Sequence, residues 1–174
     1  ILIFMKIENI ELYYLSMPEI LDEADGSQDA LIVKVEAGGY IGWGECEASP
    51  LTSIANFICP KSHSAAKPIK DTILGSELNS LNDVKKIIHN VKQNSLMIAQ
   101  TPHTFSGIEV AILDLLGKKN QTSIYDMIGY KKSNPKIAYA SVLFGNSPDE
   151  TLNIAKEMKE KKFKAVKFGW QNLV

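Results

Sequence analysis

The chain has 174 residues, of which 45% are hydrophobic and 22% charged, a balance typical of a globular protein rather than a disordered one. Its 19 basic and 20 acidic residues give a formal net charge of −1, so no basic surplus is available to neutralise nucleic-acid phosphates. No run reaches the roughly 18 consecutive apolar residues of a membrane helix, so we expect no membrane partner. The absence of a secretory signal favours a cytoplasmic location and reduced thiols at Cys46 and Cys59.

The first segments predict an antiparallel meander. We interpret residues 1–4 as an upstream extension, because Met5 is a natural start. Residues 6–15 predict a strand with a bulge near Asn9, and the acidic stretch 18–29, "PEILDEADGSQD", predicts a loop.

Two further strands, 30–36 and 40–47, flank a glycine pair at 38–39 that supplies the positive φ of a tight hairpin. In the second of these strands, Gly42 and Gly44 share one face and open it to close packing.

Helices follow the meander. Ser49-Pro50 predicts a helix start before residues 51–57, and Asn82-Asp83 predicts another before residues 84–91. The strongest helix is expected from about Phe105 to Lys118, with Gly117 and the following lysines as its stop. Its apolar residues form one wide stripe that predicts burial: Phe105, Ile108, Val110, Ile112, Leu113, Leu115 and Leu116.

The pattern changes again after Asn134-Pro135. Residues 137–144 predict a buried strand, 151–161 a helix and 164–168 a second strand, which together form one βαβ unit with parallel strands. The predicted fold class is therefore α+β, with a three-stranded meander and helices followed by the first β/α/β unit of a barrel or a doubly wound sheet.

Five sequence words occur in an order that resembles the enolase superfamily, in its mandelate racemase and muconate lactonizing enzyme branch. They are "MKIENIELYYLSMP" (5–18), "DALIVKVEAGGYIGWGECEASP" (29–50), "HTFSGIEVAILDLLGKK" (103–119), "SIYDMIGY" (123–130) and "IAYASVLFG…AVKFGW" (137–170). The resemblance implies a capping domain at 5–134 and, at 135–174, the first two strands and first helix of an incomplete TIM-like barrel.

The resemblance also implies a reaction. Members of this family remove the proton α to a carboxylate, and Mg²⁺ stabilises the enediolate that forms. Three carboxylates on the third to fifth barrel strands hold that metal, and all three positions lie beyond Val174. We therefore expect no metal site and no cofactor in this chain, and Mg²⁺ in the full-length parent.

Many relatives carry a Lys-x-Lys pair at the end of the second barrel strand, one lysine contacting the substrate carboxylate and the other acting as the base. Aligned on "AVK", Lys167 takes the first position and Gly169 the second, so the base is missing. Lys167 is the candidate catalytic residue, and a lysine that only reaches solvent from a strand end is its alternative. The missing base favours a relative whose base comes from the opposite side of the barrel, as in some acid-sugar dehydratases.

Two loop residues are candidates for substrate binding. His63, in "PKSHSAAKP", and Glu19, in the acidic loop, correspond to loops that cover the barrel mouth in the family. For both, a solvated surface side chain is the simpler interpretation. The three histidines and two cysteines lack the spacing of a zinc site.

The leading hypothesis is an N-terminal fragment of a mandelate racemase-like enzyme that acts on a hydroxy acid or sugar acid, by dehydration, racemisation or isomerisation. Its expected partners are a small carboxylic acid and further copies of itself. The fragment alone is expected to be inactive. The rival hypothesis is a short non-catalytic protein that uses the capping fold for binding or assembly. The substrate and the general base stay open, because the deciding positions are absent.

Overall fold

The computed structural model describes residues 4–19, 29–46, 49–132 and 134–169. The chain forms two compact units, one from the described residues of Ile1–Met17 and Asp29–Lys131, the other from those of Pro18–Gln28 and Lys132–Val174. Among the described helices, none is both long and apolar enough to span a membrane. The two units are described separately below.

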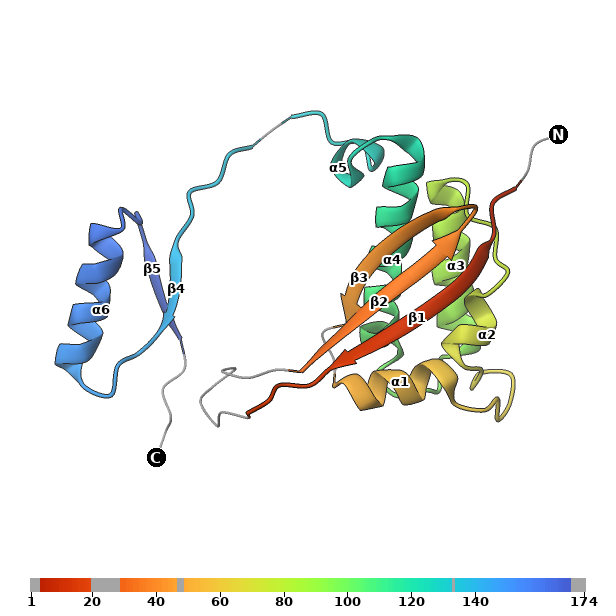
Figure 1. The fold of residues 1–174 in the computed structure, drawn as a ribbon, viewed down its shortest axis with the longest axis horizontal. Coiled ribbons are helices and arrows are strands. Elements are labelled where there is room, and N and C mark those ends of the chain that lie inside the picture. The colour runs from red at the N-terminus through yellow and green to blue at the C-terminus, as the bar shows by residue number, and fades with distance from the viewer. Residues whose placement is uncertain (1–3, 20–28, 47–48, 133, 170–174) are drawn as a thin grey trace. The chain divides into compact units, whose positions relative to one another are not determined.

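The larger unit is an antiparallel sheet followed by helices, with strand order β1-β2-β3 (Figure 1). Its elements are β1 Ile7–Leu15, β2 Ala30–Ala37, β3 Tyr40–Cys46, α1 Pro50–Ile58, α2 Ile69–Ile73, α3 Leu81–Asn94, α4 Thr101–Asn120 and α5 Ile124–Met127. The smaller unit pairs β4 Ala140–Leu143 with β5 Val166–Gly169 in parallel, joined by α6 Pro148–Glu160. The α+β fold class is confirmed.

Local sequence features behave as predicted in the meander. The β1–β2 register shifts between Ile7 and Asn9, which places the bulge where it was expected. Gly38 and Gly39 have φ of 55° and 81°, so the hairpin uses the backbone freedom that only glycine supplies at low cost. Every second residue of β2 is fully buried, which directs one face of the sheet into the core.

Helix α4 packs against β3 at a distance that only glycine permits. A Cβ on Gly42 would lie 1.9 Å from the carbonyl oxygen of Ala111, and a Cβ on Gly44 would lie 2.1 Å from that of Gly107. From the helix side, a Cβ on Gly107 would lie 2.5 Å from the sulfur of Cys46. We call this contact of Gly42, Gly44 and Gly107 the glycine seam.

Two charged side chains of α4 form hydrogen bonds with backbone groups on the edge of β3 that does not pair with β2. The backbone N–H of Trp43 donates to Asp114 Oδ2 over 2.9 Å, and Lys118 Nζ donates to the carbonyl oxygen of Ile41 over 3.0 Å. Lys118 and Asp114 also pair with each other at 2.7 Å. Two groups of an otherwise open strand edge are thereby satisfied, which protects the edge from pairing with another strand.

Several details of the helices differ from the sequence prediction. Helix α4 begins at Thr101 rather than at Phe105. Helix α4 runs through Gly117 to Asn120, because the left-handed residue that ends it is Gln121, with φ of 50°. Val110 is 49% exposed rather than part of the buried stripe, since it lies about 200° around the helix from both Ile108 and Ile112. Helix α3 starts after Ser80, where Ser80 and Asp83 form a capping box.

In the smaller unit, β4 begins at Ala140 rather than at residue 137, and Ile137 is 77% exposed. The ladder between β4 and β5 begins with Ala140 opposite Val166, because β5 has only four residues to pair with β4. Helix α6 begins at Pro148 rather than at residue 151, because Ser147 is its N-cap and accepts a hydrogen bond from the N–H of Glu150 through its side chain.

The glycine seam predicts a large cost for a single methyl group. Gly44→Ala is expected to lower the free energy of unfolding by about 2 kcal/mol, because the overpacking penalty exceeds the entropic gain of replacing a strand glycine. Urea denaturation followed by fluorescence measures this change. Glu45→Ala, on the exposed face of the same strand, is the matched control and is expected to stay within about 0.5 kcal/mol of the parent. A Gly44→Ala chain as stable as the parent would show that the helix can shift freely.

The seam also predicts an inert thiol. Cys46 is 2% exposed, its sulfur donates to the carbonyl oxygen of Thr104 at 3.3 Å, and burial raises its pKa to about 11. At pH 8 only about one Cys46 thiol in a thousand is then a thiolate, the reactive form. A thiol reagent is therefore expected to label Cys59 in the native chain and Cys46 only after denaturation. The Cys46→Ala substitution should leave the labelling rate of the native chain unchanged. Equal native reactivity of both thiols would contradict this burial.

Candidate functional site

Lys167 lies at the middle of β5, directly opposite Ser141 of β4. The neighbouring pairs, Ala140 with Val166 and Val142 with Phe168, are buried or half-buried, whereas Ser141 and Lys167 are exposed. Because side chains alternate between the two faces of a sheet, Lys167 occupies the face opposite these less exposed pairs. In a β/α barrel the helix-covered face of each strand points outward and the other face lines the interior.

Within the described strands β4 and β5, the same face carries no second ionisable group. Gly169 is two residues from Lys167, shares its face and pairs with Leu143, so the position at which relatives place a base holds no side chain. Stacked rings of Phe144 and Phe168 lie near this end of the strands, with centroids 5.3 Å apart. The described face can therefore hold an anion at one lysine, and it offers no general base.

His63 is an exposed residue in the loop between α1 and α2. Its carbonyl oxygen accepts from the N–H of Ala66 at 3.1 Å, and its Nδ1 accepts from the N–H of Ala65 at 3.3 Å. The loop thus fixes the imidazole through its own backbone, with the proton of the neutral ring on Nε2. The Nε2–H is the group that exposed His63 could offer to a ligand.

Glu19 is exposed at the start of the acidic loop, and Asp22, Glu23 and Asp25 lie outside the described residues. Asp29, at the other end, accepts from the N–H of Met17 at 2.7 Å and from the hydroxyl of Tyr14. These hydrogen bonds, the one from Tyr14 first, hold the pKa of the Asp29 carboxyl below its usual value. These bonds join the residue before β2 to the end of β1 and the segment after it, and Glu19 is an exposed carboxylate within the described residues. His63 belongs to the larger unit and Lys167 to the smaller one.

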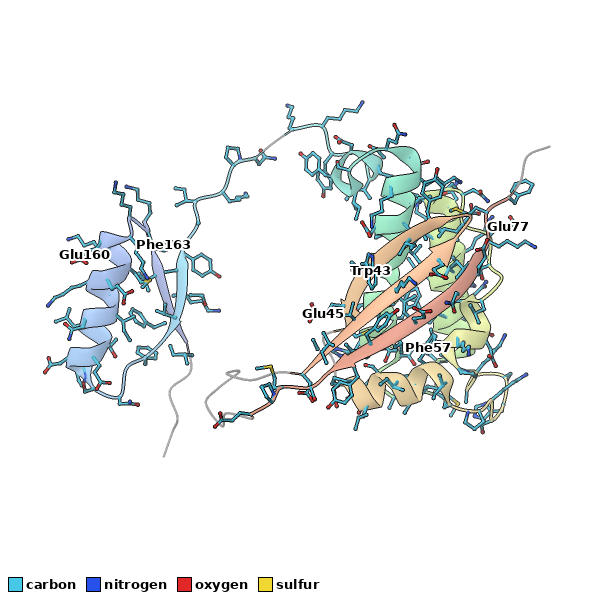
Figure 2. All side chains as sticks on the ribbon, in the orientation of Figure 1. Trp43, Glu45, Phe57, Glu77, Glu160 and Phe163 are labelled. Carbon is cyan, nitrogen blue, oxygen red and sulfur yellow. The ribbon has the colours of Figure 1, made fainter. Side chains whose placement is uncertain are left out.

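A carboxylate pair on the outer face of the sheet is already occupied. Lys34 Nζ lies 2.5 Å from Glu36 and 3.3 Å from Glu11, and these bonds raise the pKa of Lys34. Glu11 also accepts from the hydroxyl of Tyr13, which together with Lys34 lowers the pKa of the Glu11 carboxyl. One lysine between two carboxylates leaves this cluster with a net negative charge, and both carboxylates are held by hydrogen bonds rather than free for acid–base chemistry. Trp43, labelled in Figure 2, lies opposite Lys34 in the pairing of β2 with β3.

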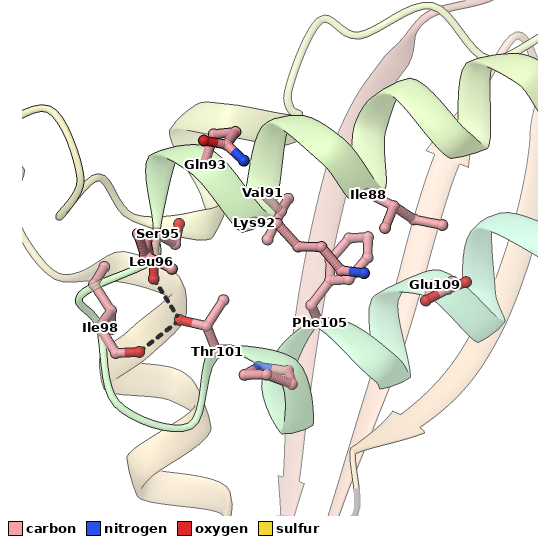
Figure 3. A pocket seen from close by; sticks show the side chains of 11 residues that line it. Ile88, Val91, Lys92, Gln93, Ser95, Leu96, Ile98, Thr101, Phe105 and Glu109 are labelled. Carbon is pink, nitrogen blue, oxygen red and sulfur yellow. Dashed lines mark hydrogen bonds between the residues drawn. The ribbon is translucent and has the colours of Figure 1, made fainter.

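The structure adds a pocket that the sequence did not reveal. It lies between α3 and α4, has a volume of about 490 Å³, and is drawn in Figure 3. Lys92 and Glu109 are its charged residues. The sequence gives only a weak indication of this pocket. Ile88 with Lys92, and Phe105 with Glu109, have the i, i+4 spacing of any helix face, and only the packing of α3 beside α4 joins the two faces into a pocket.

The described residues do not fit a divalent cation. Within the ranges 4–19, 29–46, 49–132 and 134–169, no three His, Cys, Asp or Glu side chains lie close enough together to hold a metal ion. Mg²⁺ requires several oxygen ligands, and the paired strands β4 and β5 carry no carboxylate.

Comparisons with known proteins agree with this architecture. The family model for the mandelate racemase / muconate lactonizing enzyme N-terminal domain matches residues 21–129. A predicted mandelate racemase from Rhodobacter sphaeroides is 51% identical, with a TM-score of 0.91, over 97% of this chain and 43% of its own. A muconate cycloisomerase from Pseudomonas fluorescens shares the fold at 19% identity and a TM-score of 0.70, over 94% of this chain and 42% of its own.

A curated relative, the D-gluconate/D-galactonate dehydratase of Picrophilus torridus, is 26% identical over 168 residues, which are 93% of this chain and 40% of that protein. The chain thus spans less than half the length of each of these relatives. Because the family model covers more than half of the chain, the chain belongs to the mandelate racemase / muconate lactonizing enzyme family of the enolase superfamily.

Proposed function

We propose that these residues form the cap and first two barrel strands of an enzyme that removes the α-proton of a hydroxy acid or sugar acid. The observation that carries the proposal is that Lys167 is exposed on β5 opposite Ser141, on the face that would line the interior if the barrel were closed. Family membership and the dehydratase relative support the same reaction class.

The proposed role of Lys167 is to hold the substrate carboxylate. Removal of an α-proton turns that carboxylate into an enediolate with more negative charge, so a fixed ammonium group stabilises the transition state more than the ground state. The proton must leave to a base outside β5, because Gly169 offers none. This arrangement favours dehydration over a two-lysine racemisation.

The cap would contribute selection of the substrate. We propose that His63, through its Nε2–H, and Glu19 meet the polar end of the bound acid, as a hydroxyl-rich sugar acid would require.

Since the described residues do not fit Mg²⁺, no step of this chain's own chemistry runs through the metal. The oxygen ligands for Mg²⁺ would come from the other barrel strands. Copies of the full-length protein would assemble as a homo-oligomer.

A chimera tests the proposal. Residues 5–169 are joined to the remaining barrel of the R. sphaeroides relative, and Mg²⁺-dependent uptake of deuterium at the α-carbon is measured by NMR on a panel of hydroxy acids and sugar acids. The relative itself is the positive control. The 174-residue chain alone is expected to show no exchange, because its described residues hold neither the metal site nor the base.

Lys167→Ala in the chimera is expected to lower kcat/KM by about a hundredfold, because one charge on the developing enediolate is lost. Lys164→Ala, just before the same strand, is the matched control and should change kcat/KM by less than about threefold. If Lys167→Ala changes kcat/KM as little as the control does, Lys167 is a solvated lysine without a role in the reaction. A folded, Mg²⁺-binding chimera without exchange on any acid would favour the alternative, a capping fold used for binding or assembly.

A further inference from the structure

The pocket between α3 and α4 has the size and lining of a small-molecule site. Its volume of about 490 Å³ lies within the roughly 300–1,000 Å³ usual for such sites. Its walls are mainly apolar, with Val91 and Phe105 buried and Ile88 and Ile98 half-buried. The whole pocket belongs to the larger unit, so its geometry rests on one packed body.

The polar groups at one end of the pocket are already satisfied. The hydroxyl of Thr101 contacts the carbonyl oxygens of Ser95 and Ile98 at 3.0 and 2.9 Å (Figure 3). The hydroxyl of Ser95 donates to the carbonyl oxygen of Lys67 over 2.6 Å. A ligand would therefore meet a surface that behaves as apolar there.

Two opposite charges remain available at the other end. Lys92 extends from the last turn of α3 and Glu109 from α4, and Figure 3 shows both beside Phe105. In the part of the chain that the structure describes, neither side chain has an ion-pair or hydrogen-bond partner, and they do not pair with each other. A ligand with a single charge would match one of these groups and leave the other unpaired.

We propose that this pocket binds a free α-amino acid with an apolar side chain, in its zwitterionic form. The carboxylate of the ligand pairs with Lys92, its ammonium group pairs with Glu109, and its side chain lies against Val91, Ile98 and Phe105. Both charges of the pocket are then matched by one small molecule. This ligand differs from the acid substrate proposed above, and its site does not include Lys167.

Isothermal titration calorimetry on the 174-residue chain tests the ligand class. L-leucine and L-phenylalanine are expected to bind saturably with a Kd of about 1 mM or below. Removing one charge from leucine gives 4-methylpentanoate or 3-methylbutylamine, and each is expected to bind at least about tenfold more weakly. Leucine amide and N-acetyl-leucine should weaken similarly, because each lacks one of the two charges.

Two variants test the assigned contacts. Lys92→Ala and Glu109→Gln are each expected to weaken leucine binding by about tenfold. Lys85→Ala, an exposed lysine of the same helix outside the pocket lining, is the matched control and should leave the Kd unchanged. Thermal melting of each variant checks that the fold is intact.

Three results would overturn the proposal. They are the absence of saturable binding by either amino acid, an equal affinity for leucine and 4-methylpentanoate, and an intact Glu109→Gln variant that binds leucine like the parent. The last would show that Glu109 does not meet the ammonium group.

Discussion

The close approach of α4 to β3 is the constraint on which the larger unit depends. The backbone of the helix lies so near the strand that a methyl group at Gly42 or Gly44 would overlap a carbonyl oxygen of α4. The seam lets Ile108, Ile112 and Leu115 reach full burial in the core. Because these side chains supply much of the apolar area removed from water, the seam and the core stabilise one another.

The seam also positions the groups that carry the proposals for the larger unit. Helix α4 is held against the sheet by one side, and another part of its surface forms a wall of the pocket with Phe105 and Glu109. At its start, Thr101 contacts the carbonyl oxygen of Ser95 and so joins the helix to the end of α3. The pocket is therefore a consequence of how α4 is fixed. Lys167 depends on a separate constraint, the parallel register of β4 and β5.

The sequence predicted those features that depend on neighbouring residues. The bulge near Asn9, the hairpin at Gly38 and the open face at Gly42 each follow from local backbone chemistry. The end of α4 was misplaced, because Gly117 is a plausible stop and the actual left-handed residue is a glutamine. That Lys92 and Glu109 line one pocket could not be predicted, since only the packing of α3 on α4 brings both residues to it. The sheet face on which Lys167 lies could not be predicted without the register of β5 on β4, because a strand of four residues is too short for its sequence pattern to indicate that register.

The most direct test of this account is native-state amide hydrogen exchange, read by mass spectrometry. If the seam organises the larger unit, residues 105–116 of α4 and the strand β2 should exchange slowest and at a common rate, because their amides open only in global unfolding. Helix α6, in the smaller unit, should exchange faster. Exchange of residues 105–116 as fast as that of α6, while β2 stays protected, would contradict the central role of the contact between α4 and β3.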